Sequence, residues 1–87
     1  MRYRFQEGVF LRNIQEEVVL YDTRRDQIHC FNASGANIVA EINKMSPTKE
    51  ELFSLLSVKY TVDDHVCAEI DAFLCQLIEM GLLCECE

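Results

Sequence analysis

The N-terminal part of the chain consists of short apolar runs separated by polar residues. Three runs are rich in β-branched and aromatic residues: 8–12, 18–21 and 27–31. The polar segments between them, 13–16 and 22–26, have the length of hairpin turns. Short β-forming runs joined by a few polar residues are typical of antiparallel hairpins. The pattern therefore predicts a three-stranded antiparallel sheet over residues 8–31.

After the third run, the apolar residues recur at the spacing of a helix. Residues 32–35 supply side chains suited to a helix N-cap, and the Ser-Pro pair at 46–47 ends this first helix. Thr48 and Glu51 have the spacing of a capping box, which predicts the start of a second helix. The apolar positions of the two helices are Ile38, Val39, Ile42 and Met45, then Leu52, Leu55, Leu56 and Tyr60.

The third helix has the most regular pattern in the chain. Asp63 and Asp64 suit the positive N-terminal end of a helix, and Gly81 is placed as the residue that ends it. Its apolar stripe comprises Val66, Ile70, Phe73, Leu74, Leu77 and Ile78. Three strands followed by three helices predict an α+β fold with the helices packed on one face of the sheet.

Length, composition and charge restrict the function further. The chain has 87 residues, 49% of them hydrophobic and 26% charged, which predicts one small folded domain over residues 1–87. Because no apolar run approaches the ~18 residues of a membrane span, and residues 1–7 lack the apolar core of a signal peptide, we expect a cytoplasmic protein without a membrane partner. The entire net charge of −7 lies in residues 41–87, a distribution that repels phosphate backbones.

The five cysteines do not form a recognisable metal or disulfide pattern. Their number is odd, no Cys-x2-Cys pair occurs, and a zinc site needs about four ligands brought together. We therefore expect reduced, mostly buried thiols, and no metal or other cofactor. His29 and Cys30 are neighbours in a predicted strand, so their side chains point to opposite faces and do not form a nucleophile–base pair. No catalytic residue is predicted.

Two segments resemble the sequence signature of PqqD-like proteins. Phe31 and the run Asn-Ala-Ser-Gly-Ala-Asn-Ile-Val at 32–39 are similar to the motif at that family's strand-to-helix junction. Residues 66–83, with their Phe-Leu pair and Gly-Leu-Leu ending, are similar to its closing helix. Length, element order and spacing agree over about residues 8–83, the expected core of the domain. Where many members carry Asp-Gly after the first helix, this chain has Asn-Lys-Met-Ser-Pro at 43–47.

The resemblance implies a recognition element for ribosomally made, post-translationally modified peptides. In that family, a winged-helix-like module of three strands and three helices binds the leader segment of a precursor peptide. The leader adds as a further strand along the third strand, beside the third helix. A maturation enzyme, a radical SAM enzyme or a leader protease, then acts on the tethered remainder. The resemblance thus implies a non-enzymatic, stand-alone adaptor whose partners are a leader peptide and a maturation enzyme.

The third strand and the third helix supply the expected peptide-binding residues. These are Gln27, Ile28, His29, Cys30, Phe31, Ile70, Phe73, Leu74 and Leu77. Most of the helical stripe must also pack in the core, so we expect only some of these residues to face the peptide. Phe73 and Leu74 lie about 100° apart around the helix. We therefore expect one of them to pack in the core and the other to line the groove.

Other roles remain open for several residues. Asn32 is expected as a helix cap rather than a peptide contact, and His29 as a half-buried strand residue rather than a metal ligand. The acidic residues of the third helix fit a solvated face, or attract a basic leader. The alternative function is a winged-helix nucleic-acid-binding or transcriptional regulatory domain. Residues 62–80 contain no Lys or Arg for phosphates and base edges, so no nucleic-acid partner is expected.

Overall fold

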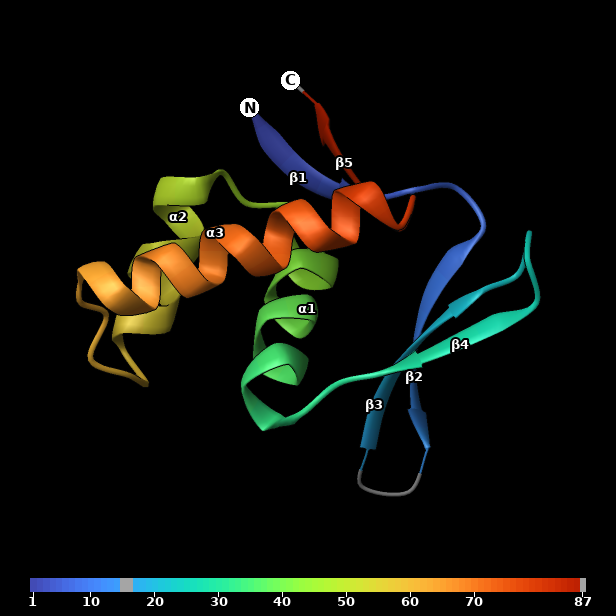
Figure 1. Cartoon of the computed structure of the whole chain (residues 1–87), viewed down its shortest axis with the longest axis horizontal. Helices are drawn as coiled ribbons and strands as arrows, with labels where there is room; N and C mark the ends of the chain where they lie inside the picture. Colours follow the sequence, from blue (N-terminus) through green and yellow to red (C-terminus); the bar gives the residue numbers. More distant parts are fainter. Residues whose placement is uncertain (15–16, 87) are drawn as a thin grey trace.

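Two small antiparallel sheets and three helices make up the chain (Figure 1) over residues 1–14 and 17–86, which are the residues that the computed structural model describes. The elements follow in the order β1 (Arg2–Phe5), β2 (Val9–Ile14), β3 (Glu17–Asp22), β4 (Gln27–Cys30), α1 (Ala33–Met45), α2 (Lys49–Ser57), α3 (Asp64–Glu79) and β5 (Leu83–Cys86). The predicted α+β fold, with a three-stranded antiparallel sheet and three helices, is confirmed.

The three-stranded sheet has the order β2-β3-β4, so β4 is an edge strand. The turn predicted at 13–16 is wrong for its first two residues, because Asn13 and Ile14 belong to β2 and pair with Val18 and Glu17 of β3. Residues 15 and 16, the rest of that predicted turn, lie outside the described residues. Cross-strand partners point to the same face of a sheet. The register thus separates an inner face, turned to the core, from an outer face.

Local capping chemistry fixes where each helix begins. The Asn32 side chain accepts a hydrogen bond from the Gly35 amide at 2.8 Å, as the predicted N-cap of α1. Thr48 and Glu51 form the predicted capping box of α2, and Asp63 caps α3. Gly81 follows the C-cap of α3 with φ +75°, a conformation that glycine adopts without strain. All these predicted helix ends are confirmed.

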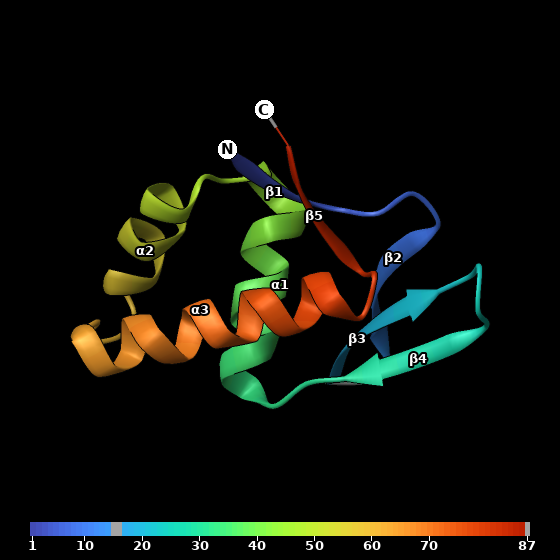
Figure 2. The same cartoon turned by 45° about the horizontal axis from the view of Figure 1, so that its top comes forward.

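A second sheet, absent from the sequence prediction, joins the two ends of the chain. Strand β1 pairs antiparallel with β5, and the two lie side by side in Figures 1 and 2. Tyr3 is only 6% exposed and belongs to the hydrophobic core, so the core extends beyond the expected limits of 8–83. The strands are four residues long and far apart in sequence, and the polar–apolar alternation of Arg2–Phe5 is too short to identify its partner.

The core lies between the inner face of the three-stranded sheet and the helices. Helix α1 is central because it contacts α2, β1, β2 and β3, while α3 crosses it in both views (Figures 1 and 2). The largest fully buried apolar side chains are Leu20, Ile42, Leu52, Leu74, Leu77, Leu82, Leu83 and Val39. Among the described helices, none is both long and apolar enough to cross a membrane.

Candidate functional site

One long edge of β4 is open. β4 is hydrogen-bonded to β3 on one side, and in the described part of the chain no strand pairs with its other side. Such an edge presents unpaired backbone N–H and C=O groups that an added strand can bind. The β4 residues alternate in direction, since His29 pairs with Leu20 on the inner face and Ile28 with Tyr21 on the outer face.

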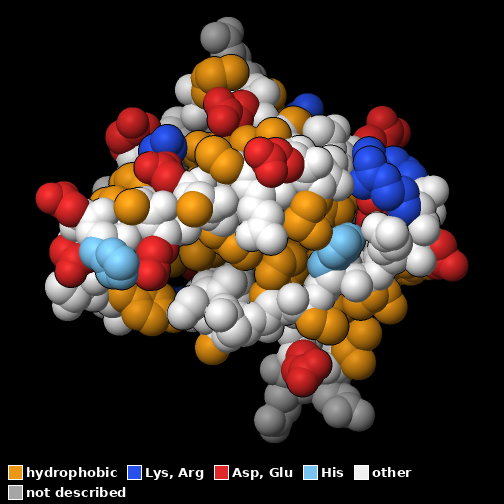
Figure 3. Space-filling view, in the orientation of Figure 1, with side chains coloured by type: hydrophobic (Ala, Val, Ile, Leu, Met, Phe, Trp, Pro, Cys, Tyr) orange, Lys and Arg blue, Asp and Glu red, His pale blue; other side chains and the backbone are white. Residues whose placement is uncertain are grey.

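A groove separates β4 from α3, and it consists of two cavities. The small cavity, of about 340 Å³, lies directly between these elements and is lined by Ile28, His29, Cys30, Phe31, Phe73, Gln76, Leu77 and Met80. The large cavity, of about 570 Å³, continues toward the start of α1 and the α2–α3 loop. Cys30, Phe31 and Phe73 line both cavities, so the two cavities adjoin, and we refer to them together as the groove. On this face, hydrophobic side chains gather between the helices and the hairpin (Figure 3).

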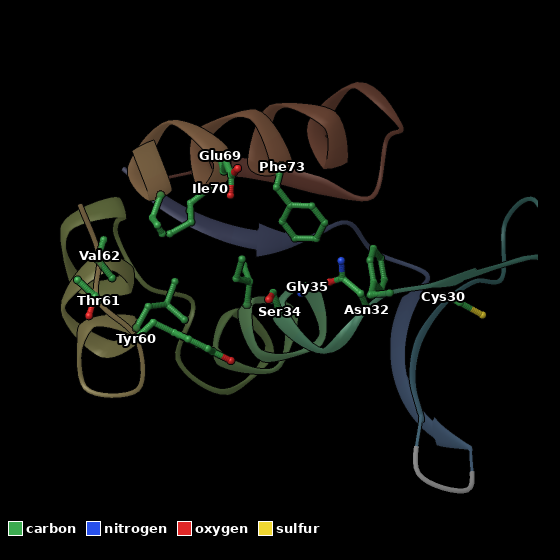
Figure 4. Close-up of a pocket in the computed structure, with 14 residues that line it drawn as sticks. Cys30, Asn32, Ser34, Gly35, Tyr60, Thr61, Val62, Glu69, Ile70 and Phe73 are labelled. Atoms are coloured by element: carbon green, nitrogen blue, oxygen red, sulfur yellow. Dashed lines mark hydrogen bonds between the residues drawn. The ribbon is translucent and has the colours of Figure 1, made fainter. Parts of the chain in front are cut away.

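An aromatic pair spans the middle of the groove. The rings of Phe31 and Phe73 meet edge to face, with their centroids 5.7 Å apart and an interplanar angle of 86°. The two residues come from either side of the groove, Phe31 from the end of β4 and Phe73 from α3. A side chain at Gly35 would place its Cβ 3.2 Å from Phe31 Cβ and 3.3 Å from Phe73 Cζ. Glycine at this position therefore leaves room for the aromatic pair. Figure 4 shows the ring of Phe73 pointing from α3 toward the start of α1, where Gly35 lies.

The large cavity is mostly apolar, with a few polar groups at its rim. Its apolar lining comes from Phe31, Ile38, Leu56, Val62, Val66, Ile70 and Phe73. Polar groups are supplied by Asn32, Ser34, Tyr60, Thr61 and Glu69. The Asn37 side chain donates a hydrogen bond to the Tyr60 hydroxyl, which ties the α2–α3 loop to α1. An apolar cleft with few polar groups is suited to bind apolar side chains of a ligand.

A charged cluster lies beside the end of the groove at which Met80 lines the small cavity. Asp22, at the end of β3, has a side chain with no exposed surface, and it forms ion pairs with Arg24 at 3.1 Å and Arg25 at 2.9 Å. The hydrogen bond from Arg24, aided by its backbone amide and by the charge of Arg25, lowers the pKa of Asp22 from 3.8 to about 2. We call these three residues the Asp22 cluster. Figure 3 shows Lys and Arg side chains gathered at the right of this face.

The predicted site residues do not all line the groove. Ile28, His29, Cys30, Phe31, Phe73 and Leu77 line the small cavity, and Ile70 lines the large one. Leu74 lines neither cavity and is 1% exposed, so it is the member of the Phe73–Leu74 pair that packs in the core. Gln27 also lines neither cavity. Of the pair Phe73 and Leu74, Leu74 packs in the core and Phe73 lines the groove.

Sequence reasoning missed much of the large cavity and the Asp22 cluster. Thr61 and Val62 come from the α2–α3 loop, where no periodicity indicates which way a side chain points. Tyr60 was placed by its spacing in the apolar stripe of the second helix, but α2 ends at Ser57 and Tyr60 is 40% exposed, so that prediction is wrong. The sequence analysis placed Val66 in the apolar stripe of the third helix and did not predict that it lines a cavity. The acidic and basic residues of the β3–β4 turn predicted a polar turn, but not the ion pairs of the Asp22 cluster.

The cysteines are more exposed than predicted. Cys30 and Cys75 are exposed, and Cys67, Cys84 and Cys86 are half-buried free thiols. The expectation of mostly buried thiols is therefore wrong, because these residues lie on outward-facing positions of α3 and the strands. His29 and Cys30 point to opposite faces of the sheet, since their partners Leu20 and Val19 are adjacent in β3. Within residues 1–14 and 17–86, no group of three or more possible ligands is placed to hold a metal ion.

Comparisons with known proteins agree with this fold. Residues 17–83 match the family model of coenzyme PQQ synthesis protein D (PqqD). Two similar solved structures are a lasso peptide synthetase B1 complexed with the leader peptide, and TbiB1 in complex with the TbiA(beta) leader peptide. The first is 20% identical with a TM-score of 0.81, covering 98% of this chain and 100% of that one. The second is 24% identical with a TM-score of 0.81, covering 97% and 98%. No curated protein matches the sequence.

Proposed function

This chain belongs to the family of coenzyme PQQ synthesis protein D, and from that premise we propose that it is an adaptor for a ribosomally made precursor peptide. It binds the leader segment of the precursor by strand addition to β4 and presents the remainder to a maturation enzyme, a radical SAM enzyme or a leader protease. The observation that carries the proposal is the open edge of β4 directly beside an apolar groove. The two similar structures support it, since both are complexes with leader peptides.

Strand addition divides the work between the peptide backbone and its side chains. Backbone hydrogen bonds to β4 give affinity that depends little on sequence, while pockets for alternate side chains give selectivity. Peptide residues on the inner face lie opposite His29 and enter the small cavity, against Phe73 and Met80 of α3. Peptide residues that extend past the C-terminal end of β4 reach the large cavity.

An adaptor of this kind needs no catalytic group of its own. A bound leader holds the rest of the precursor near the enzyme, which raises the local concentration of the substrate without any new contact. The adaptor and the enzyme thus divide recognition from chemistry. Helix α3 carries no Lys or Arg, which disfavours the alternative in which this helix contacts DNA.

A displayed library of random peptides tests the proposal without knowledge of the natural precursor. Peptides selected on the protein are titrated by calorimetry in the presence of a chelator, and we expect dissociation constants in the micromolar range or tighter. Phe73→Ala in the groove should weaken binding, whereas Cys75→Ala, on the same helix but lining neither cavity, should not. Failure to select any peptide, or binding that survives Phe73→Ala undiminished, would contradict the proposed site.

A further inference from the structure

The Asp22 cluster ties the β3–β4 turn to the end of α3. The buried Asp22 carboxylate accepts hydrogen bonds from Arg24 Nε at 3.1 Å, from the Arg24 amide at 3.1 Å and from Arg25 Nη1 at 2.9 Å. The same two guanidinium groups reach across to the helix. Arg24 Nη2 donates to the Gly81 carbonyl at 2.7 Å, and Arg25 Nη1 donates to the Met80 carbonyl at 2.8 Å.

These contacts are favourable at that end of a helix. The last carbonyls of a helix have no partner within it, and they carry the negative end of the helix dipole. The two guanidinium groups bond the carbonyls of the C-cap Met80 and of the following Gly81, at this negative end of α3, while their charge is balanced by Asp22. Because the carboxylate orients both arginines, the reach of each arginine to the helix depends on Asp22.

Two glycines leave the space that the arginines occupy. A Cβ at Gly81 would lie 2.7 Å from Arg25 Nη2, and a Cβ at Gly8 would lie 2.9 Å from Arg24 Cγ. Both glycines also have positive φ values, +75° and +89°. The cluster is thus packed between the β1–β2 and α3–β5 connections, so that three segments distant in sequence meet at one point.

The position of the cluster relates it to the groove. β4 begins at Gln27, directly after the turn that carries both arginines, and Met80 itself lines the small cavity. The Phe31–Phe73 pair joins the two walls of the groove at its middle, and the Asp22 cluster joins them at its end. The separation of β4 from α3 is therefore set at two points.

We propose that Asp22, Arg24 and Arg25 are positioning residues that fix the separation of β4 and α3 and so preorganise the groove for a peptide strand. The inference rests on the proposed function. A groove held at its binding width loses less entropy when the peptide binds. If the groove has its binding width in only a fraction of the molecules, the apparent affinity for the peptide is the intrinsic affinity multiplied by that fraction. The arginines act through the helix and the turn, not by contacting the peptide.

Asp22→Asn and Arg25→Lys test this role on a peptide selected with the unaltered protein. The first removes the charge of the carboxylate with little change in shape, and the second keeps the positive charge but loses the guanidinium fork. We expect each substitution to weaken peptide binding about tenfold or more, and a tenfold change corresponds to ~1.4 kcal/mol of binding free energy. Ile42→Val is the matched control, because Ile42 is buried in α1 and lines neither cavity. This substitution should lower the stability of the fold without changing the Asp22 cluster.

A merely structural role predicts a different result. While nearly all molecules remain folded, a variant that only lowers stability keeps its peptide affinity, as Ile42→Val should. Unchanged affinity in Arg25→Lys and in folded Asp22→Asn would overturn the inference and leave the proposed function standing. If Asp22→Asn does not fold, Arg25→Lys alone decides.

A second readout needs no peptide, so it tests the positioning role independently of the proposed function. Nuclear Overhauser contacts across the small cavity, between His29 on β4 and Leu77 or Met80 on α3, report the width of the groove. Positioning predicts that these contacts weaken in Arg25→Lys and persist in Ile42→Val, and unchanged contacts would overturn it. A protein that selects no peptide but shows this loss refutes the proposed function and retains the positioning role.

Discussion

The adjacent residues Phe73 and Leu74 of α3 should respond in opposite ways to truncation. Leu74 is 1% exposed and packs in the core, whereas Phe73 is half-buried and lines both cavities. Replacing each with alanine therefore removes a core contact in one case and a groove contact in the other. The pair is its own control, since both substitutions lie on the same turn of one helix.

The expected losses of stability follow from burial. Leu→Ala at a buried site costs about 2–5 kcal/mol of unfolding free energy, which is a large part of the roughly 4–13 kcal/mol available to a domain of this size. A fully buried Phe→Ala costs about 3–5 kcal/mol. Because Phe73 is only half-buried, we expect about 2 kcal/mol, including the ~0.5–1.5 kcal/mol of its edge-to-face contact with Phe31.

The expected losses of affinity have the reverse order. A buried aromatic anchor at an interface contributes about 2 kcal/mol or more, which corresponds to a roughly 30-fold weaker complex. Phe73→Ala should therefore bind a selected peptide at least about 30-fold less tightly. Leu74→Ala should bind normally at a temperature where it remains folded, because its side chain lines neither cavity.

Urea unfolding followed by circular dichroism gives the stabilities, and titration calorimetry gives the affinities. The reasoning is refuted if both variants unfold without a separable loss of binding, or if Phe73→Ala binds as well as the unaltered protein. Either result would mean that the peptide does not lie against this face of α3.

Two further predictions concern the ends and the middle of the groove. The pKa of Asp22 in the folded protein, about 2, lies below its ordinary value of 3.8. Its ion pairs therefore stabilise the fold fully above about pH 4, and this contribution is lost as the pH falls through 2. Acid titration followed by circular dichroism should show that the unfolding free energy falls over this window, and that it falls less in Asp22→Asn. Gly35→Ala brings a Cβ within 3.2 Å of Phe31 and 3.3 Å of Phe73. This substitution should weaken the binding of a selected peptide, measured by calorimetry. It should change the melting temperature little, because the better helix propensity of alanine, ~0.5–1 kcal/mol, offsets the crowding. A lower melting temperature with normal peptide binding would contradict this prediction.

Features that depend on neighbouring residues were predictable from the sequence. The caps at Asn32 and Thr48 each need only a side chain and an amide within three residues, and both predictions are confirmed. Asp63, predicted only as an acidic residue at the start of the third helix, is the N-cap of α3. The edge position of β4 followed from the order of three short strands joined by short turns. Local chemistry therefore fixed the elements that carry the expected site.

Features that join distant segments were not predictable in the same way. The β1–β5 pairing brings Arg2 opposite Cys86, and neither strand has a pattern that names its partner. The Asp22 cluster depends on carbonyl groups of Met80 and Gly81, and backbone carbonyls leave no trace in the sequence. The core position of Leu74 depends on the rotation of α3 about its axis, which the apolar stripe defines only to within its own width.

Hydrogen exchange of the β4 amides, with and without a selected peptide, tests strand addition most directly. In an antiparallel pair, alternate residues bond to the neighbouring strand. Strand addition therefore predicts that bound peptide newly protects every second amide within Gln27–Cys30, while the others, already bonded to β3, change little. Protection spread over α1 and α3, with none added in β4, would contradict strand addition and favour a helical ligand in the groove.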